Sequence, residues 1–412
     1  MLTDKEATLA VLAAAEPLPA HLVSLGDAGG LILAENVSAD LDSPPFTKAL
    51  VDGYAVRSSD LGAAGSSLPL GRQILAGQSP DTPLGPREAA SIMTGAPMPE
   101  GADAVVMIER TVLAGDLVEF LDDAPRPGRN LMPRGREMRA GDLVARLGDV
   151  LSPALIGLLA AVGRPRIAAF GPARVAVVPT GDELVEADFQ PGPGQIRNSN
   201  GPMLAALARE AGALATLYPI APDDEGPLTL ALKEGLDADV LLIIGGVSAG
   251  VRDLVPHALG LLGVETVFHK VRIKPGKPLL LGLGPNRSER PRCLVFGLPG
   301  NPASGFVNFH VFVAPALDKM THRQDRTRWA RLRLSTDFAH RGDRPTYHPS
   351  RYEFRDGSIA IRPLDWAGSA DLRSLTDSDA LIRFAEGDRH YRAGEEVDIL
   401  QTRGRSPDLP QP

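Results

Sequence analysis

The chain has 412 residues and a mass of 43.5 kDa, more than one hydrophobic core usually organises, so several domains are expected. A formal net charge of −8 argues against a general nucleic-acid surface, and no apolar run approaches the ~18 residues that a membrane-spanning helix needs. The single cysteine, Cys293, lies in an apolar strand pattern and the first residues lack a signal-peptide pattern, which together indicate a cytoplasmic protein.

The first part of the chain predicts a mixed domain that is interrupted by a small β domain. Residues 3–16 have the pattern of an amphipathic helix capped by Thr3 or Asp4. After them, short β-type runs are separated by glycine or proline. We therefore expect a discontinuous N-terminal domain of residues 1–45 and 146–170, with an inserted β domain of residues 46–145.

Residues 171–322 alternate apolar β-rich runs with helix-like segments. This alternation predicts a central, doubly wound parallel α/β domain with helices on both faces of the sheet. Residues 323–405 are β-rich again and predict a compact C-terminal β domain. The expected fold class is therefore α/β and multidomain, and ligands of such sheets bind at the carboxyl ends of the strands.

Two acidic turns follow predicted strands of the α/β domain. The turn Thr180-Gly181-Asp182-Glu183 can offer N–H groups and a hydroxyl to a phosphate, but it can also be a helix entry capped by Asp182. Asp223 and Asp224 carry the same ambiguity, because Asp224 can be a helix N-cap. Convergence on one sheet edge favours a ligand site formed by Thr180, Glu183, Asp223 or Asp224, Ser248 and Asp253.

Carboxylates beside hydroxyl and glycine turns suit Mg²⁺ that is held through water and substrate phosphate. The eight histidines are scattered and no C-x-x-C is present, which argues against a zinc site. The chain also has no G-x-S-x-G elbow, no Walker motif and no G-x-G-x-x-G, so hydrolase, ATPase and dinucleotide-binding interpretations lose support.

Two lysines, Lys274 and Lys277, bracket the turn Pro275-Gly276. A compact positive pair on a rigid turn suits a small oxyanion or a phosphate, bound as a point-charge site. The alternative is a solvated turn, which the neighbouring glycine turns make less favourable.

Motifs spread along the chain closely resemble those of the MoeA family, the molybdopterin molybdenumtransferases related to the gephyrin E domain. The resemblance covers roughly residues 1–405. The motifs read SPPF at 43–46, DGYAVR at 52–57, MTGAP at 93–97, GADAVV at 101–106, TGDEL at 180–184, GGVS at 245–248, IKPGKP at 273–278 and GLPGNP at 297–302.

The resemblance implies a four-domain homodimer that inserts molybdenum from molybdate into adenylylated molybdopterin and releases AMP with the assistance of Mg²⁺. It implies an active site shared between the α/β and C-terminal domains of one subunit and the inserted domain of the other. An upstream adenylyltransferase and a downstream molybdoenzyme are the implied protein partners, with no nucleic acid and no membrane.

The resemblance also implies roles for particular residues. The implied catalytic residues are Asp52, Thr94, Glu183, Asp253, Lys274 and Lys277. The implied metal-side residues are Glu183, Asp224, with Asp223 as the alternative, and Asp253. The implied contacts with molybdopterin and molybdate are Thr180, Gly245, Gly246, Ser248, Pro299, Pro302, Ser304 and Ser369.

The chain departs from the family pattern after Asn130, where Met132 replaces a functional arginine and Arg136-Glu137 replaces a Glu-Asp pair. A methionine cannot donate a hydrogen bond to an anion. We therefore expect Arg134 or Arg136 to bind the anion in place of the missing arginine, or the reaction step that uses this arginine to be weakened. The resemblance also implies an arginine of the C-terminal domain that contacts molybdate. The candidate for it in this chain is Arg351, in a register shifted from the family pattern.

These departures keep open a non-catalytic paralogue that binds molybdopterin or scaffolds a partner. A nucleotidyltransferase or pyrophosphate hydrolase is a weaker alternative, which the Gly-Gly-x-Ser turn implies because related adenylyltransferases share it, and the extra domains on both sides argue against it. Tungstate is chemically close to molybdate, so the sequence leaves the choice of oxyanion open. The enzymatic interpretation makes one geometric prediction, that Glu183, Asp253, Lys274 and Lys277 line a single cavity.

Overall fold

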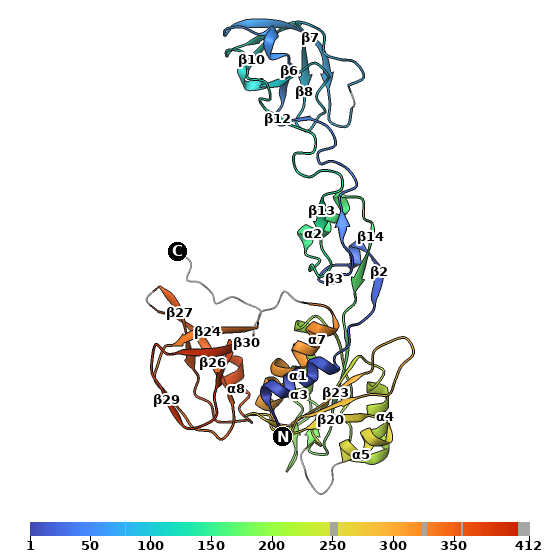
Figure 1. Cartoon of the computed structure of the whole chain (residues 1–412), viewed down its shortest axis with the longest axis vertical. Helices are drawn as coiled ribbons and strands as arrows, with labels where there is room; N and C mark the ends of the chain where they lie inside the picture. Colours follow the sequence, from blue (N-terminus) through green and yellow to red (C-terminus); the bar gives the residue numbers. More distant parts are fainter. Residues whose placement is uncertain (79, 248–253, 324–327, 356, 403–412) are drawn as a thin grey trace. The chain divides into compact units, whose positions relative to one another are not determined.

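The computed structural model describes residues 1–78, 80–247, 254–323, 328–355 and 357–402 (Figure 1). The chain divides into two compact units. The first comprises Met1–Ala34, Leu147–Ser152 and Arg166–Pro412, and the second comprises Glu35–Arg146 and Pro153–Pro165.

A six-stranded sheet forms the centre of the first unit. Its strand order is β18 (Leu214–Leu217), β15 (Arg174–Pro179), β19 (Val240–Ile244), β23 (Leu294–Leu298), β22 (Leu280–Leu283) and β20 (Glu265–His269). The strands from β18 to β23 are parallel, and only β22 runs antiparallel to its neighbours β23 and β20. The predicted doubly wound α/β domain is confirmed, with one antiparallel strand inserted near its edge.

Both faces of this sheet are buried. Successive side chains of a strand point to opposite faces, and both sets lie in a hydrophobic core. Val177, Leu242 and Phe296 lie in one core and Val178, Ile243 and Val295 in the other. The first core includes residues of α1 (Asp4–Ala14), α3 (Asn200–Glu210) and α7 (Ala314–Met320), and the second includes residues of α4 (Glu225–Gly235) and α5 (Leu254–Leu261), as Figure 1 shows. Such two-sided burial explains why the central strands β15, β19 and β23 are almost entirely apolar.

Cys293 belongs to the second core and is fully buried, so its predicted core position is confirmed. Burial raises the pKa of its thiol to about 12.

The first helix begins where the sequence predicts. The Thr3 hydroxyl accepts a hydrogen bond from the Glu6 N–H at 3.2 Å, and the Glu6 carboxylate accepts one from the Thr3 N–H at 2.9 Å. This capping box satisfies two backbone groups at the start of α1. Ala7 and Val11 then pack in the first core of the α/β sheet, so α1 covers the central domain.

The second unit contains a small antiparallel-rich β domain of the kind that the sequence predicts. Its strand order is β10 (Thr111–Ala114), β11 (Leu117–Phe120), β7 (Ser66–Ile74), β8 (Ala89–Ile92), β6 (Gly53–Val56) and β9 (Ala104–Met107). Two short pairs, β4 (Val37–Ser38) with β13 (Leu143–Ala145) and β5 (Lys48–Ala49) with β12 (Leu131–Met132), and helix α2 (Pro153–Ala161) complete the unit. The four domain boundaries drawn from the sequence stay predictions.

The C-terminal domain is a closed barrel, which confirms the predicted β domain. Its strands follow the order β24 (Trp329–Leu334), β27 (Ser358–Pro363), β26 (Thr346–Arg355), β28 (Ala380–Phe384) and β30 (Glu396–Gln401). No helix within the described ranges is long and apolar enough to span a lipid bilayer.

The barrel interior holds a cluster of rings that includes His348. Its ring contacts Phe338 and Phe384, and its Nε2 lies 2.8 Å from the carbonyl oxygen of Leu364. Burial lowers the pKa of His348 to about 4, despite the opposing effect of the Leu364 carbonyl. The folded protein therefore keeps this imidazole neutral at a pH where an unfolded chain would protonate it.

We predict that His348 makes the protein less stable as the pH falls. This group does not lower the free energy of unfolding above the unfolded pKa near 6.5; below that pH the free energy of unfolding falls, and the loss reaches about 3 kcal/mol near pH 4. Chemical denaturation across this pH range should show a shallower pH dependence for His348→Asn than for the wild type. The exposed His257→Asn is the matched control, and an equal slope in all three proteins would contradict the prediction.

Candidate active site at the strand ends

Three neighbouring parallel strands end at the same edge of the central sheet. Thr180 follows β15, Gly245 follows β19 and Pro299 follows β23. The Thr180 N–H donates to the Ile244 carbonyl at 2.9 Å, and the Gly245 N–H donates to the Leu298 carbonyl at 3.0 Å. The convergence of these turns on one edge, predicted from the sequence, is confirmed.

The turn after β19 requires glycine at both positions. Gly245 and Gly246 have φ values of 96° and 64°, a region that other residues rarely adopt. A Cβ on Gly245 would lie 2.8 Å from the Thr180 carbonyl oxygen, and one on Gly246 would lie 2.6 Å from Val255 Cγ2. The absence of side chains lets the backbone of this turn approach the Thr180 turn closely.

A cavity of about 180 Å³ lies at the Thr180 turn. It is lined by Thr180, Gly181, Asp182, Glu183, Asp223, Gly246, Leu254 and Val255. Asp182 accepts a hydrogen bond from the Asp223 N–H at 3.0 Å and so joins the turns after β15 and β18. The short strand β16 (Leu184–Val185) follows, so the alternative of a helix entry capped by Asp182 is wrong.

The structure distinguishes the two neighbouring aspartates. Asp224 is the N-cap of α4, where its Oδ1 accepts a hydrogen bond from the Gly226 N–H at 3.0 Å. Asp223 lines the cavity together with Glu183. Asp224 therefore has the capping role that the sequence left open, and Asp223 is the carboxylate at the cavity.

The donors at this cavity are of the kind that binds hard cations. Within the described ranges, no cluster of three or more histidine, cysteine, aspartate or glutamate side chains could hold an ion. Two carboxylates and a hydroxyl are hard oxygen donors, and Mg²⁺ is commonly bound by one or two carboxylates plus water and substrate phosphates. The residues at this cavity fit Mg²⁺ that is shared with a phosphate-bearing substrate.

A second cavity, of about 420 Å³, lies at the lysine turn and is built by two domains. The α/β domain contributes residues 273–278, Asn301 and Ser304, and the barrel domain contributes Arg344 and residues 366–369. Lys274 and Lys277 are both exposed, and neither has an ion-pair partner in the part of the chain that the structure describes. Arg344 pairs with its exposed neighbour Asp343 at 3.1 Å, so the two unneutralised lysines carry the net positive charge of this cavity, which suits a small anion.

The lysine turn is held from behind by Asn308, a fully buried residue of α6 (Pro302–Asn308). Its Nδ2 donates to the Gly276 carbonyl at 3.2 Å. Gly276 has a φ of 106°, and a Cβ there would lie 2.4 Å from Asn308 Oδ1. Glycine is therefore required both by the backbone conformation and by the close approach of Asn308.

Backbone hydrogen bonds join the two walls of this cavity. The Lys274 N–H donates to the Pro345 carbonyl at 2.9 Å, and the Tyr347 N–H donates to the Lys274 carbonyl at 2.8 Å. The Ala303 N–H donates to the Ser369 carbonyl at 3.0 Å. The barrel is therefore attached by backbone hydrogen bonds to the loop that carries the lysine turn and to the start of α6.

Sequence reasoning missed Arg344 and Trp366, which both line the larger cavity. The sequence candidate Arg351 lies in β26 opposite Arg362 and away from this cavity. The sequence contains both arginines, Arg344 and Arg351, at the two ends of the run 344–351. Which of them reaches the cavity depends on how this run pairs with Lys274 in the other domain, and sequence spacing does not reveal that pairing.

The predicted single cavity is not what the described residues form. Glu183 lines the smaller cavity, whereas Lys274 and Lys277 line the larger one. Thr180 and Gly246 lie with Glu183, and Ser304 and Ser369 lie with the lysines. Pro299 follows β23 and Pro302 begins α6. Ser248 and Asp253 lie outside the described residues.

In the second unit, the structure brings Asp52 and Thr94 together. Asp52 Oδ1 accepts hydrogen bonds from the Thr94 N–H at 2.7 Å and from its hydroxyl at 2.8 Å. These bonds, the backbone one first, lower the pKa of Asp52 from its usual value. The pair presents an ionised carboxylate at the surface of the β domain.

The two arginines near Met132, Arg134 and Arg136, differ in their contacts. Met132 lies in β12 opposite Lys48 of β5. Arg134 pairs with Asp42 at 2.6 Å, whereas Arg136 is exposed and Glu137 accepts a hydrogen bond from the Ser43 hydroxyl at 2.7 Å. Arg134 is thus already engaged, and Arg136 is the less constrained of the two cations.

Comparisons with known proteins cover nearly the whole chain. Three family models match: the MoeA N-terminal region (domain I and II) at residues 2–163, the probable molybdopterin binding domain at residues 176–319, and the MoeA C-terminal region (domain IV) at residues 331–402.

Among curated proteins, a molybdopterin molybdenumtransferase of Staphylococcus aureus strain Mu50 is 31% identical over 97% of this chain and 95% of its own. A protein of the same name from a Nostoc species is 33% identical over 92% and 88%. A crystal structure of a molybdopterin biosynthesis MoeA protein from Pyrococcus horikoshii matches 98% of this chain and 100% of its own, with 29% identity and a TM-score of 0.81.

We predict that Gly276→Ala disrupts the lysine turn. The left-handed backbone and the clash with Asn308 should lower the free energy of unfolding by about 1–3 kcal/mol. Gly300→Ala in the neighbouring loop is the matched control, because a Cβ there would meet no atom within 4 Å. Thermal unfolding should separate the two variants, and equal midpoints would argue against a constrained turn.

Proposed function

Because this chain belongs to the MoeA family of molybdopterin molybdenumtransferases, we infer that it transfers molybdenum to molybdopterin in molybdenum cofactor biosynthesis. We further propose that the substrates are molybdate and adenylylated molybdopterin, and that AMP is released. The observation that carries the finer proposal is the larger cavity, where Lys274, Lys277 and Arg344 converge at the end of the central sheet.

The larger cavity has the charge and the donors that an oxyanion needs. Molybdate is a small dianion, and two ammonium groups with a guanidinium can balance its charge and donate hydrogen bonds to its oxygens. Ser304 adds a hydroxyl from the start of α6. In our proposal these groups hold molybdate while its metal passes to the dithiolene sulfurs of the pterin, and Ser369 and Trp366 bound the cavity on the barrel side.

The smaller cavity suits the phosphate end of the pterin substrate. The Gly245-Gly246 turn and the Thr180 turn bring backbone groups and a hydroxyl close together without intervening side chains. Glu183 and Asp223 would hold Mg²⁺ there, and the sequence adds Asp253 and Asp224 to the candidates. When bound, Mg²⁺ would neutralise phosphate charge and so favour departure of AMP.

We also propose a cytoplasmic homodimer whose active sites are each completed by the partner subunit. The proposal of a shared site is supported by the second unit, where the ionised Asp52 carboxylate accepts two hydrogen bonds from Thr94. An adenylyltransferase that supplies the substrate and a molybdoenzyme that accepts the product are the proposed protein partners.

The alternative is a divergent paralogue that binds molybdopterin or scaffolds a partner without turnover. Met132 favours it, because a thioether cannot donate a hydrogen bond to an anion. Arg134 is already paired with Asp42, so Arg136 is the cation near Met132 that could bind the anion instead. Turnover by the purified protein separates the two proposals.

We predict that Lys277→Ala abolishes molybdate-dependent release of AMP from adenylylated molybdopterin. Loss of one of the few cations facing the oxyanion should reduce turnover by at least about 10²-fold. Lys233→Ala, on the exposed side of α4, is the control and should keep full turnover. An assay with molybdate and with tungstate measures both the rate and the preference, and full turnover by Lys277→Ala would refute the assignment.

We predict that two inactive variants restore activity when they are combined in one dimer. Coexpression of Asp52→Ala and Lys277→Ala subunits should give about a quarter of wild-type turnover, since half of the dimers are mixed and each of these has one intact site. The pair Lys274→Ala and Lys277→Ala should stay inactive, because both changes affect the same half of a site. No recovery with the first pair would indicate a site confined to one subunit.

A further inference from the structure

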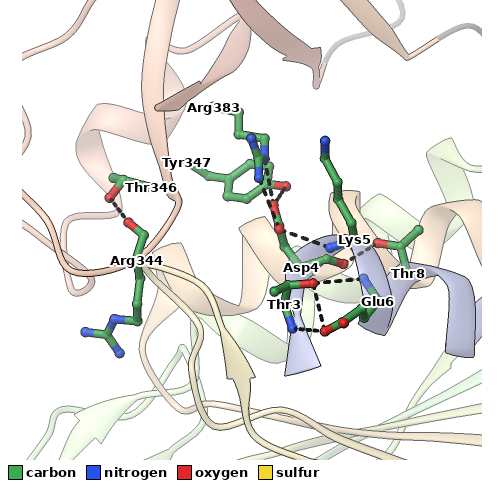
Figure 2. A network of polar contacts seen from close by, with 9 residues as sticks. All are labelled: Thr3, Asp4, Lys5, Glu6, Thr8, Arg344, Thr346, Tyr347 and Arg383. Atoms are coloured by element: carbon green, nitrogen blue, oxygen red, sulfur yellow. Dashed lines mark hydrogen bonds and ion pairs between the residues drawn. The ribbon is translucent and has the colours of Figure 1, made fainter. Parts of the chain in front are cut away.

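A buried carboxylate from the N-terminus joins the α/β domain to the barrel behind the lysine turn. Asp4 is only 2% exposed, although it is the first residue of α1. Its oxygens accept hydrogen bonds from Tyr347 Oη at 2.9 Å and from Arg383 at 2.7 and 3.2 Å, as Figure 2 shows. Tyr347 and Arg383 lie directly opposite each other on the barrel strands β26 and β28.

This carboxylate is ionised at neutral pH. Burial alone would raise the pKa of Asp4, but the bonds and charge of Arg383, the Tyr347 hydroxyl and the Lys5 N–H together hold the pKa below its usual value. A buried charge with every partner in place is stable only in one geometry, because loss of any partner leaves the others desolvated. Asp4 therefore fixes the position of Tyr347.

Tyr347 continues directly into the lysine turn. Its N–H donates to the Lys274 carbonyl, and the Lys274 N–H donates to the carbonyl of Pro345, two residues earlier in the barrel. The same short segment carries Arg344, whose carbonyl accepts a hydrogen bond from the Thr346 hydroxyl at 3.3 Å (Figure 2). This one segment of the barrel thus contacts Asp4 through Tyr347, contacts Lys274 through its backbone, and carries Arg344 of the larger cavity.

The N-terminal segment also binds the α/β side of this joint. Strand β1 (Leu2–Thr3) pairs in parallel with β21 (Val271–Arg272), with Thr3 opposite Arg272. Residues 271–272 lead into the lysine turn after a single residue, Ile273, which is fully buried. The first four residues of the chain therefore contact both walls of the joint within a few residues of Lys274.

We propose that Asp4 is a positioning residue for oxyanion binding, acting through Tyr347 to set Lys274 against Arg344. This inference rests on the proposed function, because the ligand that the cations hold is the molybdate of that reaction. Asp4 is not among the residues that line the larger cavity. Its effect is transmitted through the hydrogen bonds of the segment 344–347.

The experiment compares the wild type with Asp4→Asn, which removes the charge and keeps the shape, and with Tyr347→Phe, which removes only the hydroxyl. The measured quantities are the KM for molybdate, the KM for adenylylated molybdopterin and the thermal unfolding midpoint. The matched control is Asp239→Asn, because Asp239 is also about 1% exposed and pairs with Arg174 and Arg290, but it precedes β19 at the opposite edge of the sheet.

Asp4→Asn should raise the KM for molybdate about tenfold, since small displacements of binding groups have large effects on binding and catalysis. Its KM for adenylylated molybdopterin should stay at the wild-type value. Tyr347→Phe should change the KM for molybdate in the same direction by less. Asp239→Asn should lower the unfolding midpoint and leave both KM values unchanged.

A lower midpoint for Asp4→Asn with an unchanged KM for molybdate would overturn the inference, because Asp4 would then act only in stability. If Asp4→Asn does not fold, the KM of Tyr347→Phe for molybdate decides the question, because this variant keeps the aromatic ring and the Asp4–Arg383 ion pair. An unchanged KM for molybdate in Tyr347→Phe would then overturn the inference. Failure of the wild type itself to use molybdate would overturn the proposed function and this inference with it.

Discussion

The paired hydrogen bonds between Lys274 and the barrel segment at Pro345 and Tyr347 are the interaction on which the rest of the site depends. They bind the C-terminal barrel to the loop between β20 and β22 that carries the lysine turn. Without them the α/β domain would offer two solvated lysines and the barrel an arginine paired only with its neighbour Asp343. With them, Lys274, Lys277 and Arg344 share one cavity. Chemistry at this position is therefore a property of the joint between two domains.

Much of the central domain follows from local sequence. Runs such as residues 240–244 are continuously apolar because both faces of the sheet are covered, and the Gly245-Gly246 turn is glycine because both residues have a positive φ. The helix cap at Thr3 and the buried Cys293 also follow from local patterns. These features depend on neighbours a few residues away or on burial alone, so one sequence is enough to predict them.

The rest depends on contacts between distant segments. Sequence order places Thr180, Glu183 and the two lysines on one sheet edge, but the strand order sets their positions along it, and they line two cavities. Helix geometry chooses between Asp223 and Asp224, since only Asp224 can reach the Gly226 N–H as a cap. Arg344 is chosen over Arg351 by a contact with Lys274 some 70 residues away in sequence, a separation that no local pattern encodes.

The burial of Cys293 has a consequence for the handling of a metal by this protein. Thiolates are strong ligands for soft transition metals, and a dithiolene binds its metal through two sulfurs. The chain contains one sulfhydryl group, which is sealed in the apolar layer between the sheet and helices α4 and α5 and stays protonated near neutrality. The protein therefore offers no thiolate of its own that could compete with the cofactor for the incoming metal.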